Sequence, residues 1–436
     1  MSFVSRRAIR MLPLAAFVLI ASASLTKLPA QIQVGLALAD ITPPPGGLTT
    51  GYSSAKPTDG VHDAISARVV LLKSDESYVA LVACDLCTFN SAWLHDQISM
   101  LGIDRLLLTN THTHAGPKMN EDFPSADNPW QKTVEQRILA AIKEARENMF
   151  TGYFAASESQ IQLGYNRLIH RGKFALTYFE NPERIPYGAV DTQVGVVRIT
   201  DGDEKVRAVL VNYACHPVVL GPRNIKISAD FPGVTRRIIE EEIDDDAMCI
   251  FFQGAAGDIN PLFLARDEER TRDFDVVERM GSMLATEVLR ALSFIEDKKG
   301  KSKGFQSRSS DTTFHHRFEA DKSVDLGVTT LLINDEIGII TLPGEPFHKF
   351  AKDFRHLASL KHAYLFGYCC NAGYDWPAYI PDLVSAARGG YGASENTNAE
   401  VGAGEKLVND GLVQLFELQG RLKSEPMRNT FDVQPK

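Results

Sequence analysis

The sequence predicts an α/β fold in which mixed sheets are flanked by helices. Runs rich in β-branched and aliphatic residues alternate with amphipathic helical stretches along most of the 436 residues, a pattern that favours one α/β body over separate layers of strands and helices. Hydrophobic residues make up 44% of the chain and charged residues 23%, which is enough apolar surface for one or two sizeable cores. We expect these elements to form one folded unit.

Eight runs are predicted to be strands because they are short, apolar and rich in Val, Ile and Leu. They span residues 67–73, 78–85, 105–109, 194–200, 208–214, 248–253, 329–333 and 337–342. Asn334 and Asp335 lie between the last two runs, and such a pair is typical of a tight hairpin turn. The predicted strands therefore extend through both halves of the chain.

Four stretches have the apolar periodicity of amphipathic helices. They span residues 134–148, 234–243, 274–292 and 405–422. Residues 296–304 contain two glycines and no apolar side chain, so we expect a flexible surface connection there. Because strand-like runs resume after it, we expect residues 31–425 to form one domain and residues 426–436 to be a tail.

Residues 1–30 have the layout of a secretory signal. Arginines at positions 6, 7 and 10 precede an apolar stretch that covers residues 11–21, which is short for a bilayer core about 30 Å thick. We expect a secreted or periplasmic protein whose mature chain starts near Gln31. An uncleaved membrane anchor is the alternative, and the arginine pair also fits twin-arginine export.

Charge and cysteine content limit the class of partner. The formal net charge is −9 and no extended basic stripe appears in the body of the chain, so a nucleic-acid-binding surface is excluded. The six cysteines are Cys84, Cys87, Cys215, Cys249, Cys369 and Cys370. Several of them lie in apolar, strand-like runs, so we expect mostly buried free thiols. The Cys84-x-x-Cys87 spacing is typical of redox or zinc motifs, but a second pair is missing.

His112 and His114 lie where a predicted strand runs out into a loop. They follow residues 105–109 and precede a Gly-Pro pair. Side chains two residues apart in an extended chain project on the same side. Two imidazoles on one face could supply two of the ligands of a zinc site. The alternative, that they are only polar residues at a strand end, explains the pair equally well.

Other polar side chains also follow apolar runs. His216 precedes Pro217 at the end of residues 208–215, and the acidic residues in comparable places are Asp85, Asp230, Asp258 and Glu345. Each of them alone fits a turn or a helix cap. Together they indicate a site, because ligand sites on α/β scaffolds form at strand ends.

Seven short motifs occur in an order and rough spacing that resemble those of the neutral/alkaline, non-lysosomal ceramidases. They are Ile41-Thr-Pro-Pro44, Thr111-His-Thr-His-Ala-Gly-Pro117, Asn166-Arg167, Cys215-His-Pro217, Ser228-Ala-Asp-Phe-Pro-Gly233, Phe252-Gln-Gly-Ala-Ala-Gly-Asp258 and Pro343-Gly-Glu345. The resemblance covers most of residues 34–400, which correspond to the catalytic N-terminal domain of that family. It implies a zinc enzyme that hydrolyses the amide bond of ceramide.

The resemblance also implies a set of site residues. One zinc ion per chain would be held by His112, His216, Glu345 and Tyr379, with Tyr374 as the alternative tyrosine. The residues facing the substrate would be His114, Arg167, Asn260 and Tyr391. An open zinc site lowers the pKa of bound water to about 7, polar donors can stabilise the developing oxyanion, and His114 or Glu345 would act as general base.

Two departures from the family pattern bear on function. Where the ceramidases have a serine before the proline, this chain has Asn260, which cannot act as a nucleophile but can donate a hydrogen bond. A mechanism through water survives this change, an acyl-serine mechanism does not, and ceramide itself comes into question as the substrate. The chain also ends shortly after the helix predicted to close at Leu422, so we expect the family's C-terminal immunoglobulin-like domain to be missing.

Three functions are consistent with these observations. The first is an exported zinc amidohydrolase that cleaves an N-acyl lipid or a linear amide, with peripheral membrane contact as an option. The second is a related zinc hydrolase acting on an ester or a cell-wall amide, and the third is a catalytically inactive exported binding protein. His112, His216 and Glu345 favour the two enzymes, whereas Asn260 favours the third function.

Overall fold

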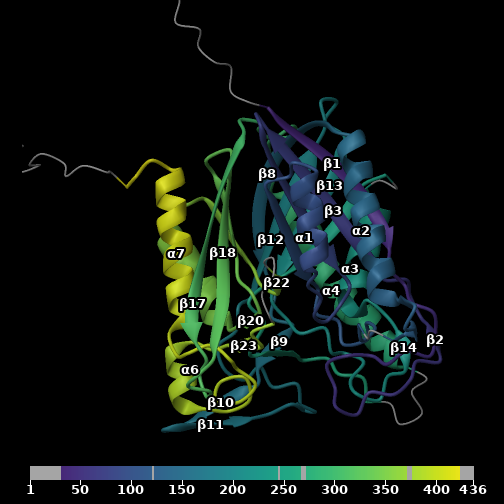
Figure 1. The fold of residues 1–436 in the computed structure, drawn as a ribbon, viewed down its shortest axis with the longest axis vertical. Helices are drawn as coiled ribbons and strands as arrows, with labels where there is room; N and C mark the ends of the chain where they lie inside the picture. Colours follow the sequence, from purple (N-terminus) through teal and green to yellow (C-terminus); the bar gives the residue numbers. More distant parts are fainter. Residues whose placement is uncertain (1–30, 120–121, 244–245, 267–271, 371–375, 423–436) are drawn as a thin grey trace, which may run out of the picture.

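The computed structural model describes residues 31–119, 122–243, 246–266, 272–370 and 376–422. These residues form four layers, which are helices, a nine-stranded sheet, a four-stranded sheet and helices again (Figure 1). The two sheets enclose one apolar core, and the outer side of each packs against its own helices. The predicted α/β fold with mixed sheets flanked by helices is therefore confirmed.

The nine-stranded sheet mixes parallel and antiparallel strands. In spatial order its strands are β15 (Met248–Gln253), β13 (Val206–Tyr213), β12 (Gln193–Thr200), β8 (Phe150–Gln160), β1 (Ile32–Asp40), β3 (Ser66–Ser74), β4 (Ser77–Cys84), β5 (Arg105–Asn110) and β22 (Cys369–Cys370). The pairs β4–β5 and β13–β15 are parallel, and the other pairs are antiparallel.

Strong twist brings the two ends of this sheet together. β15 contacts β4 and β5, although it lies at the opposite end of the strand order. Neighbouring strands are rotated by roughly 20–25°, which accumulates to about half a turn over nine strands. The carboxyl ends of β5 and β15 therefore meet, and the Gln253 Nε2 atom at the end of β15 donates hydrogen bonds to the carbonyls of Thr111 and Cys215 at 3.0 and 2.9 Å.

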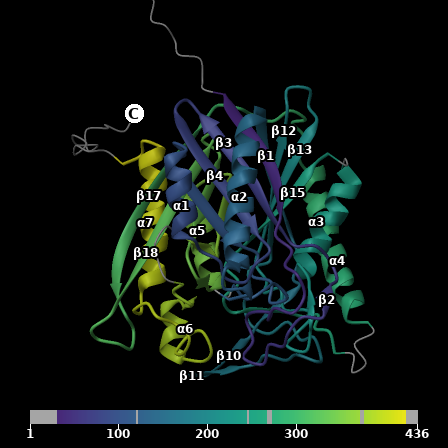
Figure 2. The ribbon, with the colours of Figure 1, turned by 45° about the vertical axis from the view of Figure 1, so that its right-hand side comes forward.

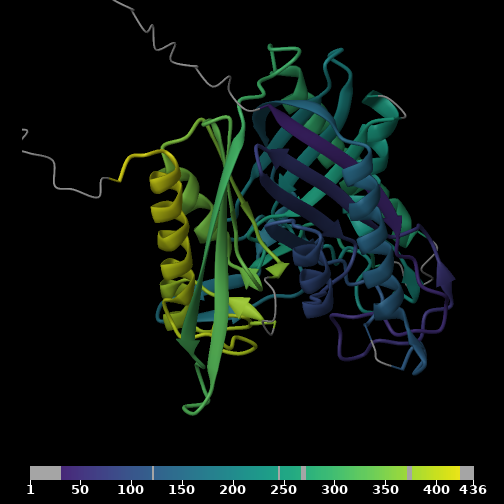
Figure 3. The ribbon, with the colours of Figure 1, turned by 45° about the horizontal axis from the view of Figure 1, so that its top comes forward.

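Four helices cover the outer side of the nine-stranded sheet, as the views in Figures 2 and 3 show. They are α1 (Ala92–Met100), α2 (Trp130–Glu147), α3 (Asp230–Ile243) and α4 (Asp273–Ser293). α2 lies so close to β1 that a Cβ atom on Gly35 would come within 1.8 Å of the Ala145 carbonyl oxygen. Only glycine fits at that crossing.

The four-stranded sheet faces the core from the other side. Its strands in spatial order are β17 (Phe305–His315), β18 (Ser323–Ile333), β19 (Ile337–Thr341) and β21 (His362–Phe366), and its covering helices are α5 (His348–Ala358) and α7 (Ala403–Leu418). β19 and β21 are parallel. Phe252 and Phe366 stack between the two sheets with ring centroids 4.3 Å apart.

Short elements complete the end of the molecule at which these strands finish. The two-stranded pairs are β9 (Gly164–Asn166) with β16 (Ile259–Pro261), β10 (Leu168–Arg171) with β11 (Phe174–Thr177), β20 (Glu345–Pro346) with β23 (Tyr379–Ile380), β2 (Gly60–Val61) with β14 (Lys226–Ile227), and β6 (Pro124–Ser125) with β7 (Asn128–Pro129). The short helix α6 (Leu383–Arg388) lies beside β11.

All eight predicted strands and all four predicted helices are present. The last helix ends at Leu418 instead of residue 422 because its C-cap is Gln419 and Gly420 follows with a positive φ. Asn334 and Asp335 both have positive φ in the turn between β18 and β19, as a tight hairpin requires. The described cysteines are free and buried, as expected.

Two other expectations concern the ends and the middle of the chain. Residues 296–304 have no helix, and Lys301 in this connection pairs with Phe154 of β8 through two backbone hydrogen bonds of 2.7 and 2.9 Å. The expected signal peptide at residues 1–30 and the expected tail at residues 426–436 lie outside the described residues. Among the described helices, none is both long and apolar enough to cross a bilayer.

Candidate metal centre

The histidines of the site stand in loops that follow parallel strands. His112 comes two residues after β5, and its backbone N–H donates to the Leu86 carbonyl at 2.9 Å. His216 follows β13, and its N–H donates to the Ile259 carbonyl at 3.1 Å. His112 has a φ of +69°, a conformation that costs energy for a residue with a Cβ atom and that is typical of functional sites.

Glu345 joins the two histidines from the other half of the molecule. Its Oε2 atom lies 3.3 Å from His112 Nε2 and 3.1 Å from His216 Nε2. The ligand-type atoms of the three residues lie within 4.8 Å of one another, and all three side chains are buried. Two imidazoles and one carboxylate that converge in this way are a common ligand set for zinc and other transition metals. We call these three residues the His/Glu cluster.

The outer nitrogen of each histidine faces a backbone carbonyl. His112 Nδ1 lies 2.7 Å from the Cys87 carbonyl oxygen, and His216 Nδ1 lies 2.8 Å from that of Ala256. A carbonyl can only accept, so both Nδ1 atoms carry a proton, and Nε2 is the ring nitrogen that each histidine turns toward the cluster. Such outer hydrogen bonds fix the tautomer and the orientation of metal-ligating histidines.

The charges in the His/Glu cluster also fit a cation. Burial opposes the charge of Glu345, but the neighbouring imidazoles of His112 and His216 outweigh it and hold the pKa of this carboxyl well below its usual value. Burial lowers the pKa of His216 to about 4. A buried carboxylate is stable only beside positive charge, which a divalent ion would supply.

Tyr379 is placed next to Glu345 by a short parallel pairing. The two residues are direct partners in the β20–β23 register. The Tyr379 ring stacks near His216, with centroids 6.5 Å apart, and the Arg167 guanidinium lies 5.0 Å from the Tyr379 ring centre. The alternative ligand Tyr374 lies outside the described residues.

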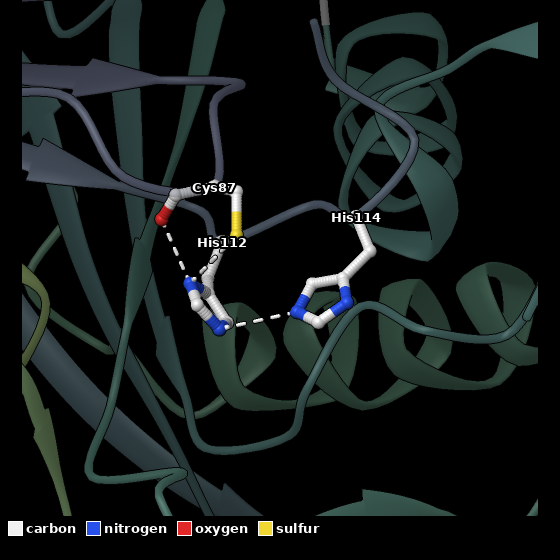
Figure 4. Close-up of side chains that lie close together, drawn as sticks. All are labelled: Cys87, His112 and His114. Atoms are coloured by element: carbon white, nitrogen blue, oxygen red, sulfur yellow. Dashed lines mark hydrogen bonds between the residues drawn. The ribbon is translucent and has the colours of Figure 1, made fainter. Parts of the chain in front are cut away.

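His114 lies beside the cluster without joining it. Its Nε2 atom is 3.3 Å from His112 Nε2, as Figure 4 shows together with Cys87. Burial lowers the pKa of His114 well below its usual value, and His112 and His216 lower it further, so this ring is neutral. Its position requires Gly51, because a Cβ atom there would meet the ring at 2.2 Å.

A cavity of about 710 Å³ opens onto this group. The polar side chains that line it include His114, Arg167, His216, Asn260, Tyr379 and Tyr391, and the apolar ones include Phe179, Val218, Leu220, Pro222 and Leu264. Arg167 donates hydrogen bonds to Asn260 Oδ1 at 3.2 Å and to the Gly257 carbonyl at 2.6 Å. The eight residues expected from the sequence therefore gather in one region: three form the His/Glu cluster, and the other five surround the cavity.

The acidic residues Asp85 and Asp258 do not enter the cluster. Asp85 forms a bidentate ion pair with Arg236, with both distances 2.7 Å. Asp258 accepts hydrogen bonds from Asn166 Nδ2 at 2.7 Å and from His348 Nδ1 at 2.6 Å. Both pairs lie behind the site and hold its loops.

Asp230 also lies away from the cluster, at the start of α3. Burial raises the pKa of Asp230 to about 7. Its carboxyl group accepts hydrogen bonds from the N–H of Phe231 at 2.6 Å and from the N–H of Leu220 at 3.4 Å, so it joins the start of α3 to the loop that carries Leu220.

Tyr368 is a site residue that the sequence did not indicate. Its ring contacts His112, with centroids 4.5 Å apart, and its φ is +55°. Within the part of the chain that the structure describes, its buried hydroxyl has no hydrogen-bond partner, and neither does His114 Nδ1. The available signal was that Tyr368 comes just after the apolar run that forms β21, where a strand end brings polar side chains to the site.

The fold and the cluster thus define an α/β protein with a buried His/Glu site of the metal-ligand type. The model of the family described as neutral/alkaline non-lysosomal ceramidase, N-terminal, matches residues 32–278. The chain belongs to this family, as the motifs predicted.

A curated relative is similar over part of both chains. Neutral ceramidase A of Dictyostelium discoideum is 26% identical over an alignment of 260 residues, and the match covers 52% of this chain and 36% of the relative. The match therefore spans about a third of that relative's length.

Two solved structures share the fold beyond residue 278. A neutral ceramidase from Pseudomonas aeruginosa has a TM-score of 0.70 at 15% identity, covering 91% of this chain and 76% of that chain. A structure described as ceramidase complexed with C2 gives the same score and coverage at 14% identity. At such identities the likeness shows the fold alone.

Proposed function

We propose that the protein is an exported zinc-dependent hydrolase that cleaves the amide bond of an N-acyl lipid of the ceramide type. The observation that carries this proposal is the His/Glu cluster at a cavity whose walls are partly apolar. Membership of the ceramidase family and the name of the Dictyostelium relative support a lipid amide as the substrate.

Four residues would hold the zinc ion. His112, His216 and Glu345 present their ligand atoms to one point, and Tyr379 lies next to Glu345 in the β20–β23 pair. When bound, zinc acts as a Lewis acid and lowers the pKa of a bound water to about 7.

Arg167 and its neighbours would orient the amide. The buried Arg167 guanidinium lies near the rings of Tyr379 and Tyr391, at 5.0 and 5.1 Å. A fixed cation in such a place stabilises the negative charge that develops on a carbonyl oxygen during attack. Asn260 Oδ1 accepts from Arg167, so Asn260 would hold the guanidinium in its orientation instead of acting as a nucleophile.

His114 would transfer the proton. Its ring is neutral and its Nε2 atom points toward the His/Glu cluster. A neutral imidazole can accept the proton of the attacking water at one ring nitrogen and can return it to the leaving nitrogen, as general catalysis of amide cleavage requires.

The apolar wall residues suit an acyl chain. Val218, Leu220 and Leu264 line the cavity together with Phe179, and burial of each methylene group of a substrate chain contributes about 0.8 kcal/mol.

The proposed export rests on the layout of residues 1–30. N-terminal sequencing of the mature protein should give a start near Gln31, and an intact N-terminus would contradict cleavage.

Asn260 favours a second candidate within the same chemistry, a hydrolase for an ester or for an amide other than ceramide. The family's serine would present a hydroxyl to the substrate, whereas Asn260 presents an amide whose oxygen is engaged by Arg167. The head-group preference of this protein would then differ from that of its relatives.

The decisive experiment combines metal analysis with a substrate panel. Purified full-length protein should contain one zinc ion per chain and should hydrolyse N-acyl sphingosines faster than matched esters. His112→Ala should lose both metal and turnover, and the exposed His356→Ala on α5 is the matched control that should keep both. Protein without stoichiometric metal would refute the zinc site, and turnover of esters alone would refute the amidase.

A further inference from the structure

The β10–β11 hairpin has its apolar side turned outward. Phe174 and Leu176 alternate with Ala175 and Thr177, and they are 55% and 42% exposed. The inner side packs on the body of the protein, since Thr177 Oγ1 accepts a hydrogen bond from the Tyr391 N–H at 3.0 Å. In an ordinary half-buried strand the apolar side faces the core, so this hairpin has the reverse arrangement.

The outward side continues across both strands and onto the next residues of the chain. Ile169 is the partner of Leu176, and Arg171 is the partner of Phe174; direct partners project on the same face. Tyr178 and Phe179, which follow β11, are 36% and 49% exposed.

This face borders the mouth of the cavity. Phe179 lines the cavity and makes an edge contact with Tyr391 at 5.0 Å. Helix α6 contacts β11, and both lie at the same end of the molecule in Figures 1 and 2. The α6 segment packs on the inner side of the hairpin, where Arg388 contacts His170. We call Phe174, Leu176 and Phe179 the apolar rim.

The β10–β11 hairpin is positively charged in a chain whose net charge is −9. Residues 168–178 carry Arg171 and Lys173 and no Asp or Glu, whereas Glu180 and Glu183 follow Phe179. Exposed apolar side chains flanked by basic ones are the combination that binds a bilayer with anionic head groups. A lipid substrate would enter the cavity through this mouth, which favours a bilayer over a protein as the occupant of the apolar rim.

We propose that the apolar rim docks the protein on an anionic phospholipid bilayer, with the cavity mouth facing the lipid from which the substrate is taken. The biological role of this docking rests on the proposed hydrolysis of an N-acyl lipid. The docking itself can be tested separately, because binding to vesicles is measured without any turnover.

The test is sedimentation of full-length protein with vesicles made of equal parts phosphatidylcholine and phosphatidylserine. The double variant Phe174→Ser/Leu176→Ser should bind these vesicles at least about tenfold more weakly than the wild type. Leu357→Ser, an equally exposed leucine on α5, is the matched control and should bind normally. His112→Ala should also bind normally, which separates docking from catalysis.

Two further measurements complete the test. Arg171→Glu and Lys173→Glu should each weaken binding by about fivefold, through loss of the attraction to phosphatidylserine. The Phe174→Ser/Leu176→Ser variant should keep turnover of a water-soluble short-chain amide while losing turnover of a vesicle-embedded one. The proposal would be overturned if the wild-type protein did not sediment with the vesicles, or if the double variant bound them as tightly as the wild type does. So would a change from dimer to monomer caused by the double variant, because the rim would then be a self-interface.

Discussion

The two sheets contribute to the site in different ways. The half built on the nine-stranded sheet supplies both histidines from loops after parallel strands, and the family model matches within it, at residues 32–278. The half built on the four-stranded sheet supplies Glu345, Tyr379 and Tyr391 from short segments between its strands and helices. The His/Glu cluster takes residues from both halves, so it exists only where the two halves meet.

The largest expected effect comes from removing the ligand that the smaller half supplies. Glu345→Gln keeps the size of the side chain but removes the charge that faces His112 and His216. We expect at least a 100-fold loss of zinc affinity, beyond what the loss of an outer partner causes, and no measurable turnover. Metal analysis after dialysis and a turnover assay measure this; unchanged zinc content would show that the larger half binds metal by itself.

A large effect on stability is expected inside the larger half. Asp85→Ala would leave the buried Arg236 without its bidentate partner, and such a loss costs about 3–5 kcal/mol. Urea unfolding of the metal-free protein measures the difference. Arg237→Ala, next in the chain but exposed and paired with Glu241, is the control and should cost less than about 1 kcal/mol.

A smaller, pH-dependent effect is expected where the halves are joined by Asp258 and His348. Burial opposes the charge on His348, but Asp258 raises the pKa of His348 above its usual 6.5. This contribution to stability is fully present below pH 6.5 and is lost as the pH rises through the raised value. His348→Gln should therefore cost about 1.5 kcal/mol below pH 6.5 and progressively less in alkaline solution.

The Asp258 carboxylate determines the lowest pH at which the same pair stabilises the protein. Burial opposes its charge as well, but His348 lowers the pKa of Asp258 below 3.8, so its contribution is present above that pH and is lost as the pH falls through the lowered value. Denaturation curves measured across this range check both limits. A cost of His348→Gln that stays constant with pH would contradict the charged pair.

The smallest effect is expected at Asn260. Asn260→Ala removes the acceptor for Arg167 Nη1 and leaves the His/Glu cluster in place, so turnover should fall about tenfold at unchanged zinc content. Asn260→Asp keeps an acceptor and serves as the comparison. Equal turnover of Asn260→Ala and wild type would remove this residue from the site.

Much of the fold could be predicted because its central strands are buried on both faces. β4, β5, β13 and β15 are continuous apolar runs. Strand β1 was missed because Gly35 interrupts its apolar run, and Gly35 is required by the close approach of α2. β17 was missed because most of its side chains are polar and exposed along one edge of the smaller sheet.

The site could be predicted less directly. His112 and His216 follow visible strands, but the pairing of Glu345 with Tyr379 depends on a register between segments more than thirty residues apart, which no local pattern encodes. Glu345 was visible as an acidic residue after an apolar run, but its role as a ligand, like the choice of Tyr379, came from the family resemblance. Tyr368 was missed because its role follows from its contact with the His112 ring and from no spacing in the sequence.

The side chain of Gln253 has a mechanical consequence. Its carboxamide holds the carbonyls of Thr111 and Cys215, and its Oε1 atom accepts from the Cys215 N–H at 3.2 Å. The two histidine loops, which depart from strands near opposite edges of a twisted sheet, are thus clamped by one rigid planar group. If the sheet bends, both loops move together, so the distance between the imidazoles of His112 and His216 is expected to change little.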